Sequence, residues 1–274
     1  MTGPAISAII VTYHTGPRLK ECLYALAADP DVAEMVIVDN GNPPEMQAWL
    51  NAFSTRREAV TLLSGQGNIG FGAAVNLAVA RANGPHILVI NPDAVLRRGS
   101  LQGMQVVAEA CPQPWIVGGR IFDLLGREVR GPRRRELTIW RAATNLIGWN
   151  TWTLEHTPPP AAPVEMPVIS GAFFLTSKDS LAQLEGFDEA YFLHVEDIDL
   201  CRRCREAGGR VIYDPRAGAL HYGATSSVPG GTIAGHKADS LALYFKKFAR
   251  GPIERLLVAL IVPVLRLAMR VTRS

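Results

Sequence analysis

The sequence contains few cysteines and no hydrophobic run long enough to cross a membrane. Its four cysteines, Cys22, Cys111, Cys201 and Cys204, are too few and too scattered to predict the disulfide framework of a secreted protein, which favours a reducing compartment. The apolar run at residues 256–265, LLVALIVPVL, is well short of the ~20 residues that a spanning helix needs. The first residues, MTGPAISAIIVTY, lack the basic segment of a signal peptide, and we expect none.

A zinc site is not predicted either. Cys201 and Cys204 form a C-x-x-C pair, but no second pair of Cys or His stands nearby to complete a tetrahedron. Together with Leu200 and Ala207 they follow the apolar stripe of a helix, so we interpret them as packing residues. Internal repeats and low-complexity segments are also absent from the sequence.

Charge is distributed unevenly along the chain. The sequence has 274 residues, and 48% of them are hydrophobic. Residues 237–274 hold eight Lys or Arg against two acidic residues, a net charge of +6, so the formal charge of +3 leaves −3 on the rest. The size allows one large domain or two small ones. A slightly acidic body with a basic, apolar tail predicts contact with an anionic membrane surface and not with nucleic acid.

Short β-rich segments alternate with helical patterns in the first half of the chain. The expected strands are residues 7–12, 35–38, 60–63 and 86–90, and the expected helices are 18–28, 45–53, 71–82 and 100–110. This order predicts an α/β fold with a mostly parallel sheet and helices on both faces. Ligands bind such sheets at the carboxyl ends of the strands, where this chain has polar residues or glycines at positions 12–13, 39–40, 65–70 and 91–93.

The second half is less regular. A basic loop (127–135), a Trp-rich stretch (140–152) and a Pro-rich stretch (158–167) are typical of a variable, substrate-facing insertion. Regular structure is expected again at residues 168–176, in a helix that ends at Gly208, in a strand at 210–213 and in a helix at 237–249. A C-terminal amphipathic segment follows.

Three carboxylates lie within four positions in the stretch HVEDIDLCRRCREAGG: Glu196, Asp197 and Asp199. They repel one another, and any that is buried needs a cation, hydrogen bonds or a proton. One interpretation is structural, because acidic residues stabilise the first turn of a helix and Asp199 pairs with Arg203 at i,i+4. The other is a functional site, and the residues alone do not decide between them.

Residues 65–70, GQGNIG, match the dinucleotide-binding pattern G-x-G-x-x-G from Gly65 to Gly70. They follow an expected strand and precede an expected helix, and Asp93 lies a little over twenty residues on, as an NAD site requires. The pattern lies on the third strand and not on the first, however, and Asp93 follows an Asn-Pro turn. An NAD site, a site for another nucleotide diphosphate and a purely structural turn all remain open.

Seven segments, in order, carry a family resemblance: SAIIVTYHTG, VIVDN, GNIGFGAAVNLA, VINPDAVL, ISGAFFLTSKD, GFDEAYFLHVEDIDLCRR and ALHYG. Together they resemble the inverting family 2 glycosyltransferases of GT-A fold, in the rhamnosyltransferase-like branch that acts on lipid-linked glycans. The resemblance implies a GT-A domain at residues 1–235. Residues 1–118 would bind the nucleotide sugar, 119–235 would bind the acceptor and carry catalysis, and 236–274 would form basic, amphipathic, membrane-associating helices.

The resemblance also implies site residues. Asp39 would accept a hydrogen bond from the imino N–H of uracil or thymine, although an Asp there can also cap a turn. Asn91-Pro92-Asp93 stands where the family has D-x-D, so Asp93 alone offers a charged ligand for Mg²⁺ or Mn²⁺. The implied nucleotide-sugar positions, several of which could instead serve packing, are Thr12, Tyr13, Asp39, Asn68, Gly70, Asn76, Asn91 and Asp93.

The remaining implied roles concern the metal and the base. His221 resembles the histidine that completes the metal site, and imidazole suits Mn²⁺ better than Mg²⁺; a histidine there can also be a satisfied polar residue. Asp197 would be the general base, with Glu196 beside it binding acceptor hydroxyls or tuning its pKa. A one-residue shift at a helix start turns a side chain by about 100°, so which of the two faces the cleft stays open.

The implied reaction is inverting transfer of L-rhamnose from dTDP-rhamnose, or of a sugar from a UDP-linked donor, to a lipid-linked or polysaccharide acceptor in cell-envelope glycan synthesis. The expected location is cytoplasmic and peripheral, on the inner face of the cell membrane. The alternatives are an NAD-dependent oxidoreductase that uses residues 65–70 and a non-catalytic, membrane-docked glycan-binding protein. The tail could instead pack on the protein's own core or in a homodimer interface, and Pro263 should kink or interrupt it.

Overall fold

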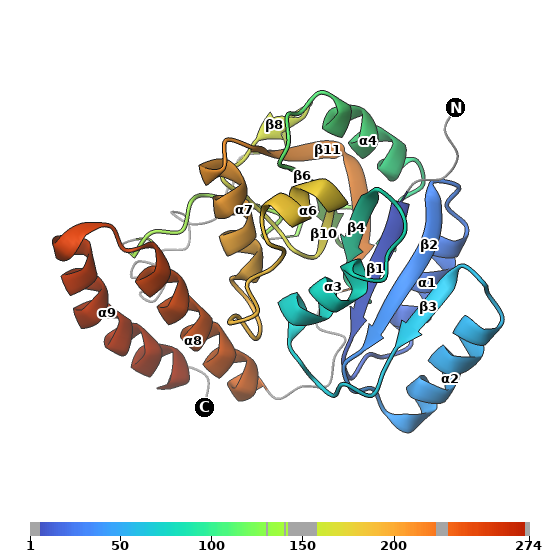
Figure 1. Cartoon of the computed structure of the whole chain (residues 1–274), viewed down its shortest axis with the longest axis horizontal. Helices are drawn as coiled ribbons and strands as arrows, with labels where there is room; N and C mark the ends of the chain where they lie inside the picture. Colours follow the sequence, from blue (N-terminus) through green and yellow to red (C-terminus); the bar gives the residue numbers. More distant parts are fainter. Residues whose placement is uncertain (1–5, 130, 140, 142–157, 223–229, 272–274) are drawn as a thin grey trace.

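The computed structural model describes residues 6–129, 131–139, 141, 158–222 and 230–271 (Figure 1). The Trp-rich stretch predicted at 140–152, apart from residue 141, lies outside the described residues. The strands are β1 (Ile6–Thr12), β2 (Val32–Asp39), β3 (Val60–Leu63), β4 (His86–Ile90), β5 (Ala94–Leu96), β6 (Trp115–Phe122), β7 (Arg133–Arg134), β8 (Val164–Glu165), β9 (Val168–Ile169), β10 (Phe173–Ser177) and β11 (Arg210–His221). The helices are α1 (Arg18–Ala27), α2 (Pro44–Thr55), α3 (Phe71–Val79), α4 (Ser100–Glu109), α6 (Lys178–Gln183), α7 (Glu196–Glu206), α8 (Gly230–Phe248) and α9 (Gly251–Val271).

One mixed sheet forms the centre of the molecule, in the order β3-β2-β1-β4-β10-β6-β11-β5, with β8 on β11. The first four strands of this order are parallel, and β6 pairs in parallel with β11. Strand β10 runs antiparallel between β4 and β6, and β5 and β8 pair antiparallel with β11. The largely parallel sheet predicted from the βαβα order is therefore confirmed, with antiparallel strands added from the less regular second half.

Both faces of the sheet are covered, as predicted. On β1 the buried side chains alternate, so that Ile9 and Val11 face one core while Ala8 and Ile10 face the other. Helices α3, α6 and α7 pack on the first face, and α1, α2 and α4 pack on the second. This arrangement places the carboxyl ends of β1, β2 and β4 along one edge of the sheet.

Strand β11 is longer than the four residues predicted. It continues to His221 through a register shift between Asp214 and Gly218, and Pro215 lies within the shift. Proline cannot donate to a sheet ladder and is tolerated at a bulge. The sequence pattern breaks at this proline although the strand does not, and the extension carries His221 to its position beside β5.

Helices α8 and α9 lie side by side at one end of the molecule (Figure 1). Tyr244 and Phe245 of α8 and Val258 and Val262 of α9 are buried in the core that covers the first face of the sheet. Helix α8 begins at Gly230, so the domain boundary expected after residue 235 falls within a helix. Pro263 lies within α9, and the helix continues past it to Val271. Within the described ranges, every helix is too short or too polar to cross a membrane.

Candidate active site

The carboxyl ends of β1 and β2 are joined by a buried polar network. The Asn42 amide donates to Thr12 Oγ1 (2.7 Å) and to Asp39 Oδ1 (2.8 Å). Asp39 Oδ1 also accepts the backbone N–H groups of Gly41 and Asn42, each at 2.9 Å. Asp39 therefore caps the turn that follows β2, which is the structural role left open by the sequence. Its contact with a nucleobase stays a prediction.

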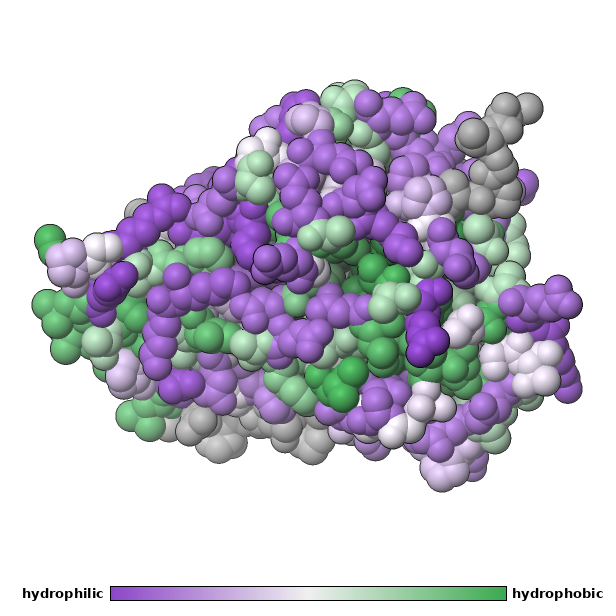
Figure 2. Space-filling view, viewed as in Figure 1, coloured by the Kyte–Doolittle hydropathy of each residue, from purple (hydrophilic) through white to green (hydrophobic). Residues whose placement is uncertain are grey.

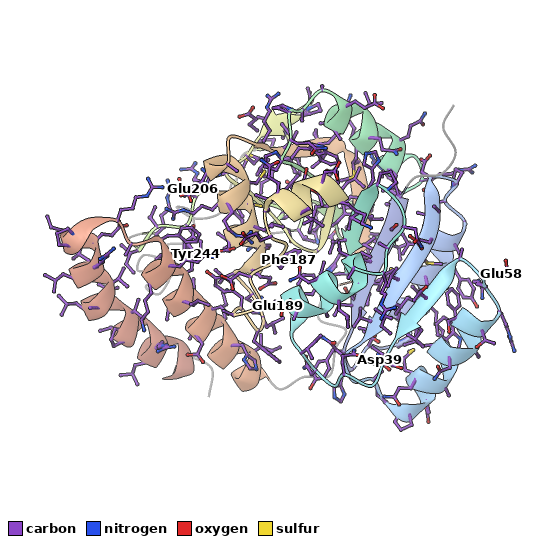
Figure 3. All side chains as sticks on the ribbon, viewed as in Figure 1. Asp39, Glu58, Phe187, Glu189, Glu206 and Tyr244 are labelled. Atoms are coloured by element: carbon purple, nitrogen blue, oxygen red, sulfur yellow. The ribbon has the colours of Figure 1, made fainter. Side chains whose placement is uncertain are left out.

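The glycine loop after β3 folds over this network. Gln66 Nε2 donates to the Asp39 carbonyl (2.8 Å), and Asn40 Nδ2 donates to the Gly70 carbonyl (3.0 Å). Asn68 Oδ1 accepts the Gly70 N–H within the loop at 3.1 Å. The loop therefore lies beside Asp39. Figure 3 labels Asp39 at the edge of the sheet.

Gly70 has a specific steric reason to be glycine. Its φ is +87°, and a Cβ there would lie 2.6 Å from the carbonyl oxygen of Phe192, which accepts the N–H of Phe71 at 3.0 Å. A Cβ at Gly65 or Gly67 would meet nothing within 4 Å. The last glycine of the pattern thus permits close packing against the loop that leads to α7, a requirement that the sequence pattern alone does not reveal.

Asn76 of α3 holds the chain before α7. Its Nδ2 donates to the Phe187 carbonyl (2.8 Å) and to Glu189 (3.0 Å), and its Oδ1 accepts the Phe187 N–H (2.9 Å). Figure 3 shows Phe187 and Glu189 next to α3. These contacts are those of a packing residue, the alternative that the sequence left open, and a contact of Asn76 with the nucleotide sugar stays a prediction.

The two predicted metal ligands lie together although they are far apart in the sequence. His221 Nε2 is 3.1 Å from Asp93 Oδ1, and Asn91 Nδ2 is 3.5 Å from the same ring nitrogen. The antiparallel pairing of β5 with β11, in which His221 is opposite Ala94, creates this arrangement. A carboxylate oxygen and an imidazole nitrogen are suitable donors for Mn²⁺.

The donor set is small. Across the described ranges the protein gathers no group of three or more His, Cys, Asp or Glu side chains that could hold an ion. An ion at Asp93 and His221 would therefore need further oxygen ligands from the bound donor or from water, which is common for Mg²⁺ held beside phosphates. The residues fit a site that is completed by its substrate.

The Cys201 and Cys204 thiols are buried in the core, and burial raises the pKa of both to about 12, which supports their interpretation as packing residues.

Tyr222, which sequence reasoning did not single out, fixes the end of β11 against α1. Its hydroxyl donates to Glu21 (2.6 Å), and the Arg18 guanidinium lies 4.1 Å from the centre of its ring. Arg18 and Glu21 are themselves paired. These contacts fix the position of the residue that follows His221. The signal in the sequence that could have pointed to Tyr222 is its place directly after a candidate metal ligand.

The predicted base lies at the first turn of α7. Asp197 Oδ2 accepts the N–H of Gly171 at 2.9 Å and lies 3.7 Å from Arg134 Nη1. A Cβ on Gly171 would come within 3.0 Å of the Asp197 Cβ, so glycine allows this close approach. Gly171 and Arg134 were not predicted as partners, because the contacts join three separate segments of the chain.

Glu196 occupies a different environment from its neighbour. The side chain is buried, and its Oε2 has no hydrogen-bond partner among the described residues. Burial, followed by the negative charge of Asp197, raises the pKa of Glu196 from 4.5 to about 8. Burial therefore favours the protonated form of this carboxyl group.

The backbone before the acidic pair is strained. His194 (φ +66°) and Val195 (φ +73°) both adopt the left-handed conformation, which costs roughly 1–2 kcal/mol for a non-glycine residue. Helix α8 supports this segment, because Ser240 donates to the Leu193 carbonyl (2.9 Å) and His236 packs on the Phe192 ring (4.5 Å between centroids). Strain held in place by packing is a feature of functional sites, and here it sets the start of α7.

Asp199 pairs with Arg203 within α7. The side chain is fully buried, and its Oδ2 accepts Arg203 Nε at 2.6 Å. Its Oδ1 also lies 2.7 Å from Lys247 Nζ of α8 and accepts the Tyr191 hydroxyl at 3.3 Å. The three carboxylates of the cluster thus have three environments: Asp199 is paired with cations, Glu196 is buried with a raised pKa, and Asp197 is buried beside a backbone donor and Arg134.

The acidic pair and the Asp93–His221 pair belong to the same edge of the sheet. Phe173, the first residue of β10, is opposite Ile90, the last residue of β4. Beyond them the Asn91 N–H donates to the Ala172 carbonyl at 2.9 Å, and Gly171 is the next residue, whose N–H binds Asp197. The sheet therefore positions both groups around one region.

Solved structures share this fold. The structure of GalNAc-T7 with UDP, GalNAc and Mn²⁺ has a TM-score of 0.66 and 12% identity, covering 88% of this chain and 47% of that one, so the chain spans about half its length. The mannosyltransferase PcManGT from Pyrobaculum calidifontis, in complex with GDP-Man and Mn²⁺, has a TM-score of 0.62 and 17% identity, covering 98% and 73%. These likenesses establish the fold, which is that of the GT-A glycosyltransferases.

The sequence then assigns the family. Residues 7–184 match the family described as Glycosyl transferase family 2, and the chain belongs to it. It is 30% identical over 251 residues to the N-acetylglucosaminyl-diphospho-decaprenol L-rhamnosyltransferase of Mycobacterium tuberculosis, covering 84% of this chain and 81% of the relative. It is 25% identical over 225 residues to the rhamnosyltransferase WbbL of Escherichia coli, covering 78% and 82%. The predicted glycosyltransferase is confirmed, and the oxidoreductase and non-catalytic alternatives are set aside.

Proposed function

We propose that the chain transfers L-rhamnose from dTDP-rhamnose, with inversion, to a lipid-linked glycan in cell-envelope glycan synthesis. The choice of sugar and acceptor is supported by the similarity to the decaprenol-linked L-rhamnosyltransferase, which extends over 84% of the chain. A lipid-linked acceptor lies at a membrane, so the enzyme would work as a peripheral protein at its inner face. The observation that carries the catalytic part is the position of Asp197 at the same sheet edge as Asp93 and His221.

Asp197 would act as the general base. Inversion in one displacement requires a base opposite the leaving group, placed to accept the proton of the acceptor hydroxyl as its oxygen attacks the anomeric carbon. The Gly171 N–H and the nearby Arg134 hold the Asp197 carboxylate in one orientation. Glu196 is less suited to this role because it is buried, and burial raises its pKa and so favours the protonated acid; as an acid it would donate a hydrogen bond to an acceptor oxygen.

Asp93 and His221 would hold the divalent cation, Mg²⁺ or Mn²⁺, with the Asn91 amide next to them. When bound, such an ion neutralises the charge that develops on the nucleoside diphosphate leaving group. Tyr222 keeps the end of β11 against α1, which holds His221 next to Asp93. Asp39, in its turn at the end of β2, would face the nucleobase.

A donor panel tests this proposal. Release of the nucleoside diphosphate would be measured from dTDP-rhamnose, UDP-linked sugars and GDP-mannose, with and without a detergent-solubilised polyprenyl diphosphate acceptor. We expect acceptor-dependent release that is fastest with dTDP-rhamnose, and a product with inverted anomeric configuration by NMR. Preference for a UDP-linked sugar would correct the donor alone, whereas retention of configuration would contradict the role of Asp197.

A further inference from the structure

One face of α9 is apolar and exposed. Five large aliphatic side chains with exposed fractions of 60–76% are spaced by three or four residues, so that they form one continuous stripe along the helix. The stripe, here called the α9 face, consists of Ile253, Leu256, Leu260, Val264 and Leu267. Figure 2 shows hydrophobic residues gathered at the α8–α9 end of the molecule.

The α9 face is not the side through which the helix packs on the rest of the protein. Val258 and Val262, each 4% exposed, lie on the opposite side of the helix and are buried in the core. Helix α9 is thus already docked through one side. Only five other large hydrophobic side chains in the described part of the chain are exposed, by 38–73%, and they are distributed over four separate elements or turns. Among the side chains that the structure describes, those of the α9 face alone form such a stripe.

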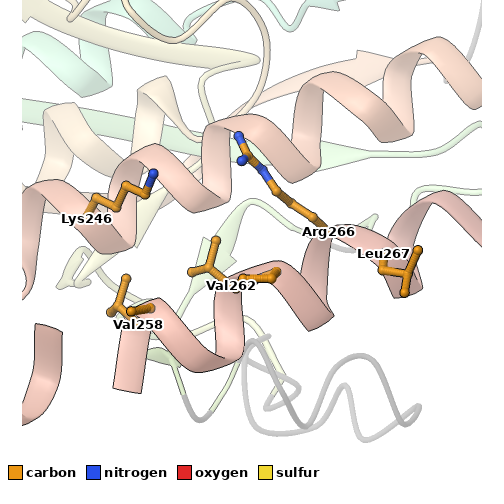
Figure 4. A pocket seen from close by; sticks show the side chains of 7 residues that line it. Lys246, Val258, Val262, Arg266 and Leu267 are labelled. Carbon is orange, nitrogen blue, oxygen red and sulfur yellow. The ribbon is translucent and has the colours of Figure 1, made fainter. Parts of the chain in front are cut away.

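Basic side chains accompany this face. A groove of about 540 Å³ lies between α8 and α9 (Figure 4). Its lining includes the apolar side chains of Val258, Val262 and Leu267 and the basic side chains of Lys246 and Arg266. Arg266 pairs with Asp239 of α8 at 2.8 Å, and Arg255 is exposed on α9. Residues 237–274 carry a net charge of +6. Apolar side chains next to excess positive charge complement a surface that is apolar inside and anionic outside.

We propose that the α9 face docks the enzyme on a bilayer that contains anionic phospholipid. The helix of 21 residues is about 30 Å long, and it would lie in the plane of the membrane with its aliphatic stripe among the acyl chains. The exposed Lys246 and Arg255 would lie near the lipid phosphates, while Arg266 stays paired with Asp239. The proposal rests on the proposed function only for the benefit of docking, which would bring the active site to a lipid-linked acceptor. The exposed apolar surface itself is seen in the structure.

A second copy of the chain is a poorer occupant of this face. In a two-fold dimer the same patch meets itself, and Arg255 and Arg266 of one copy would approach those of the other. Like charges brought together in this way oppose association. An anionic bilayer has the opposite charge and has no need for a matching shape, which suits a stripe made only of aliphatic side chains.

Vesicle flotation without any donor sugar tests this inference independently of activity. The full chain would be mixed with vesicles of phosphatidylcholine alone or of phosphatidylcholine with phosphatidylglycerol, at low and high salt. We expect flotation mainly with the anionic vesicles, weakened by salt. The double variant Leu256→Ser/Leu260→Ser should reduce the partition coefficient by about tenfold or more, while its melting temperature stays close to that of the parent.

The matched control is Leu124→Ser/Leu125→Ser, which changes two leucines that lie away from α9 and are at least as exposed, and it should float like the parent. Analytical ultracentrifugation of the same proteins would show whether the α9 face instead binds a second copy of the chain. The inference is overturned if the parent does not float with anionic vesicles or if the α9 double variant floats as well as the parent. It is also overturned if that variant instead converts a dimer to a monomer, which would make the face a subunit interface.

Discussion

At the scale of the residue, two neighbouring carboxyl groups differ because of what surrounds them. Asp197 has a backbone donor and a nearby guanidinium, whereas Glu196 is buried with an oxygen that lacks a partner in the described part of the chain. Burial without a partner favours the neutral form of an acid. The environment thus distinguishes two residues whose orientation the sequence left open.

The first prediction concerns the base. Asp197→Asn should leave donor affinity nearly unchanged and lower kcat by roughly 10²–10⁴-fold, the usual contribution of a general base. Glu196→Gln should cost less, because an amide replaces a group that is already neutral. Initial rates and donor binding by calorimetry would measure both, with the exposed Asp179→Asn as the control. An active Asp197→Asn together with an inactive Glu196→Gln would reverse the assignment.

The second prediction concerns stability and pH. The pKa of Glu196 is raised from 4.5 to about 8, so between these values the folded chain keeps a proton that the unfolded chain has released. This group therefore makes the free energy of unfolding fall as pH rises through that window, by at most about 1.4 kcal/mol per pH unit. Below the window its contribution is fully present.

Glu196→Gln cannot ionise and should remove that part of the pH dependence. Relative to the parent, the variant should become progressively more stable as pH rises from about 5 to about 8, as measured by urea unfolding. Parallel stability curves for the two proteins would show that Glu196 is ionised in the folded chain at neutral pH.

The third prediction concerns the metal. With one carboxylate and one imidazole as its protein ligands, the ion should be readily removed, so EDTA should abolish sugar transfer and Mn²⁺ should restore it. Asp93→Ala should lose both turnover and the donor-dependent binding of Mn²⁺ seen by electron paramagnetic resonance. Transfer that continues at an unchanged rate in the chelator would exclude the proposed role of the ion.

At the scale of the element, the start of α3 and the approach to α7 depend on each other. Gly70 precedes α3, and its place is limited by the Phe192 carbonyl, while the strained residues His194 and Val195 lie between Phe192 and the acidic pair. A shift of the loop at residue 192 would move the start of α7. The glycine pattern therefore constrains the start of α7 as well as its own loop.

The fourth prediction separates this contact from ordinary backbone strain. Gly67→Ala (φ +69°) has open space around the new Cβ and should cost only about 1 kcal/mol of unfolding free energy. Gly70→Ala adds a 2.6 Å clash with backbone and should cost more than about 2 kcal/mol and lower kcat as well. Chemical denaturation and initial rates would test the pair, and equal effects of the two substitutions would contradict the steric account.

At the scale of the whole molecule, the C-terminal segment belongs to the fold and also extends its surface. The sequence left open whether the tail packs on the protein or lies on a membrane. The structure shows packing through Val258 and Val262 and leaves the opposite side of α9 exposed. The two interpretations therefore apply to different faces of one helix.

The fifth prediction tests that division. Val262→Ala removes buried methyl groups and should lower the free energy of unfolding by about 1–2 kcal/mol. Leu260→Ala, two residues earlier on the exposed side, should change it by less than about 0.5 kcal/mol. Thermal and urea unfolding would measure both substitutions. A larger loss for Leu260→Ala would mean that the exposed face is covered in the free protein.

The sequence by itself determined the α/β order, the first four strands, the glycine loop, the acidic helix and the family, because these depend on local periodicity and on short motifs. Tertiary structure decided which groups meet and which are buried. His221 meets Asp93 only because β11 continues past Pro215 and pairs with β5, and the pKa of Glu196 is raised by burial and then by the charge of Asp197. Distance and burial arise from contacts between segments far apart in the chain, and no local pattern of residues records them.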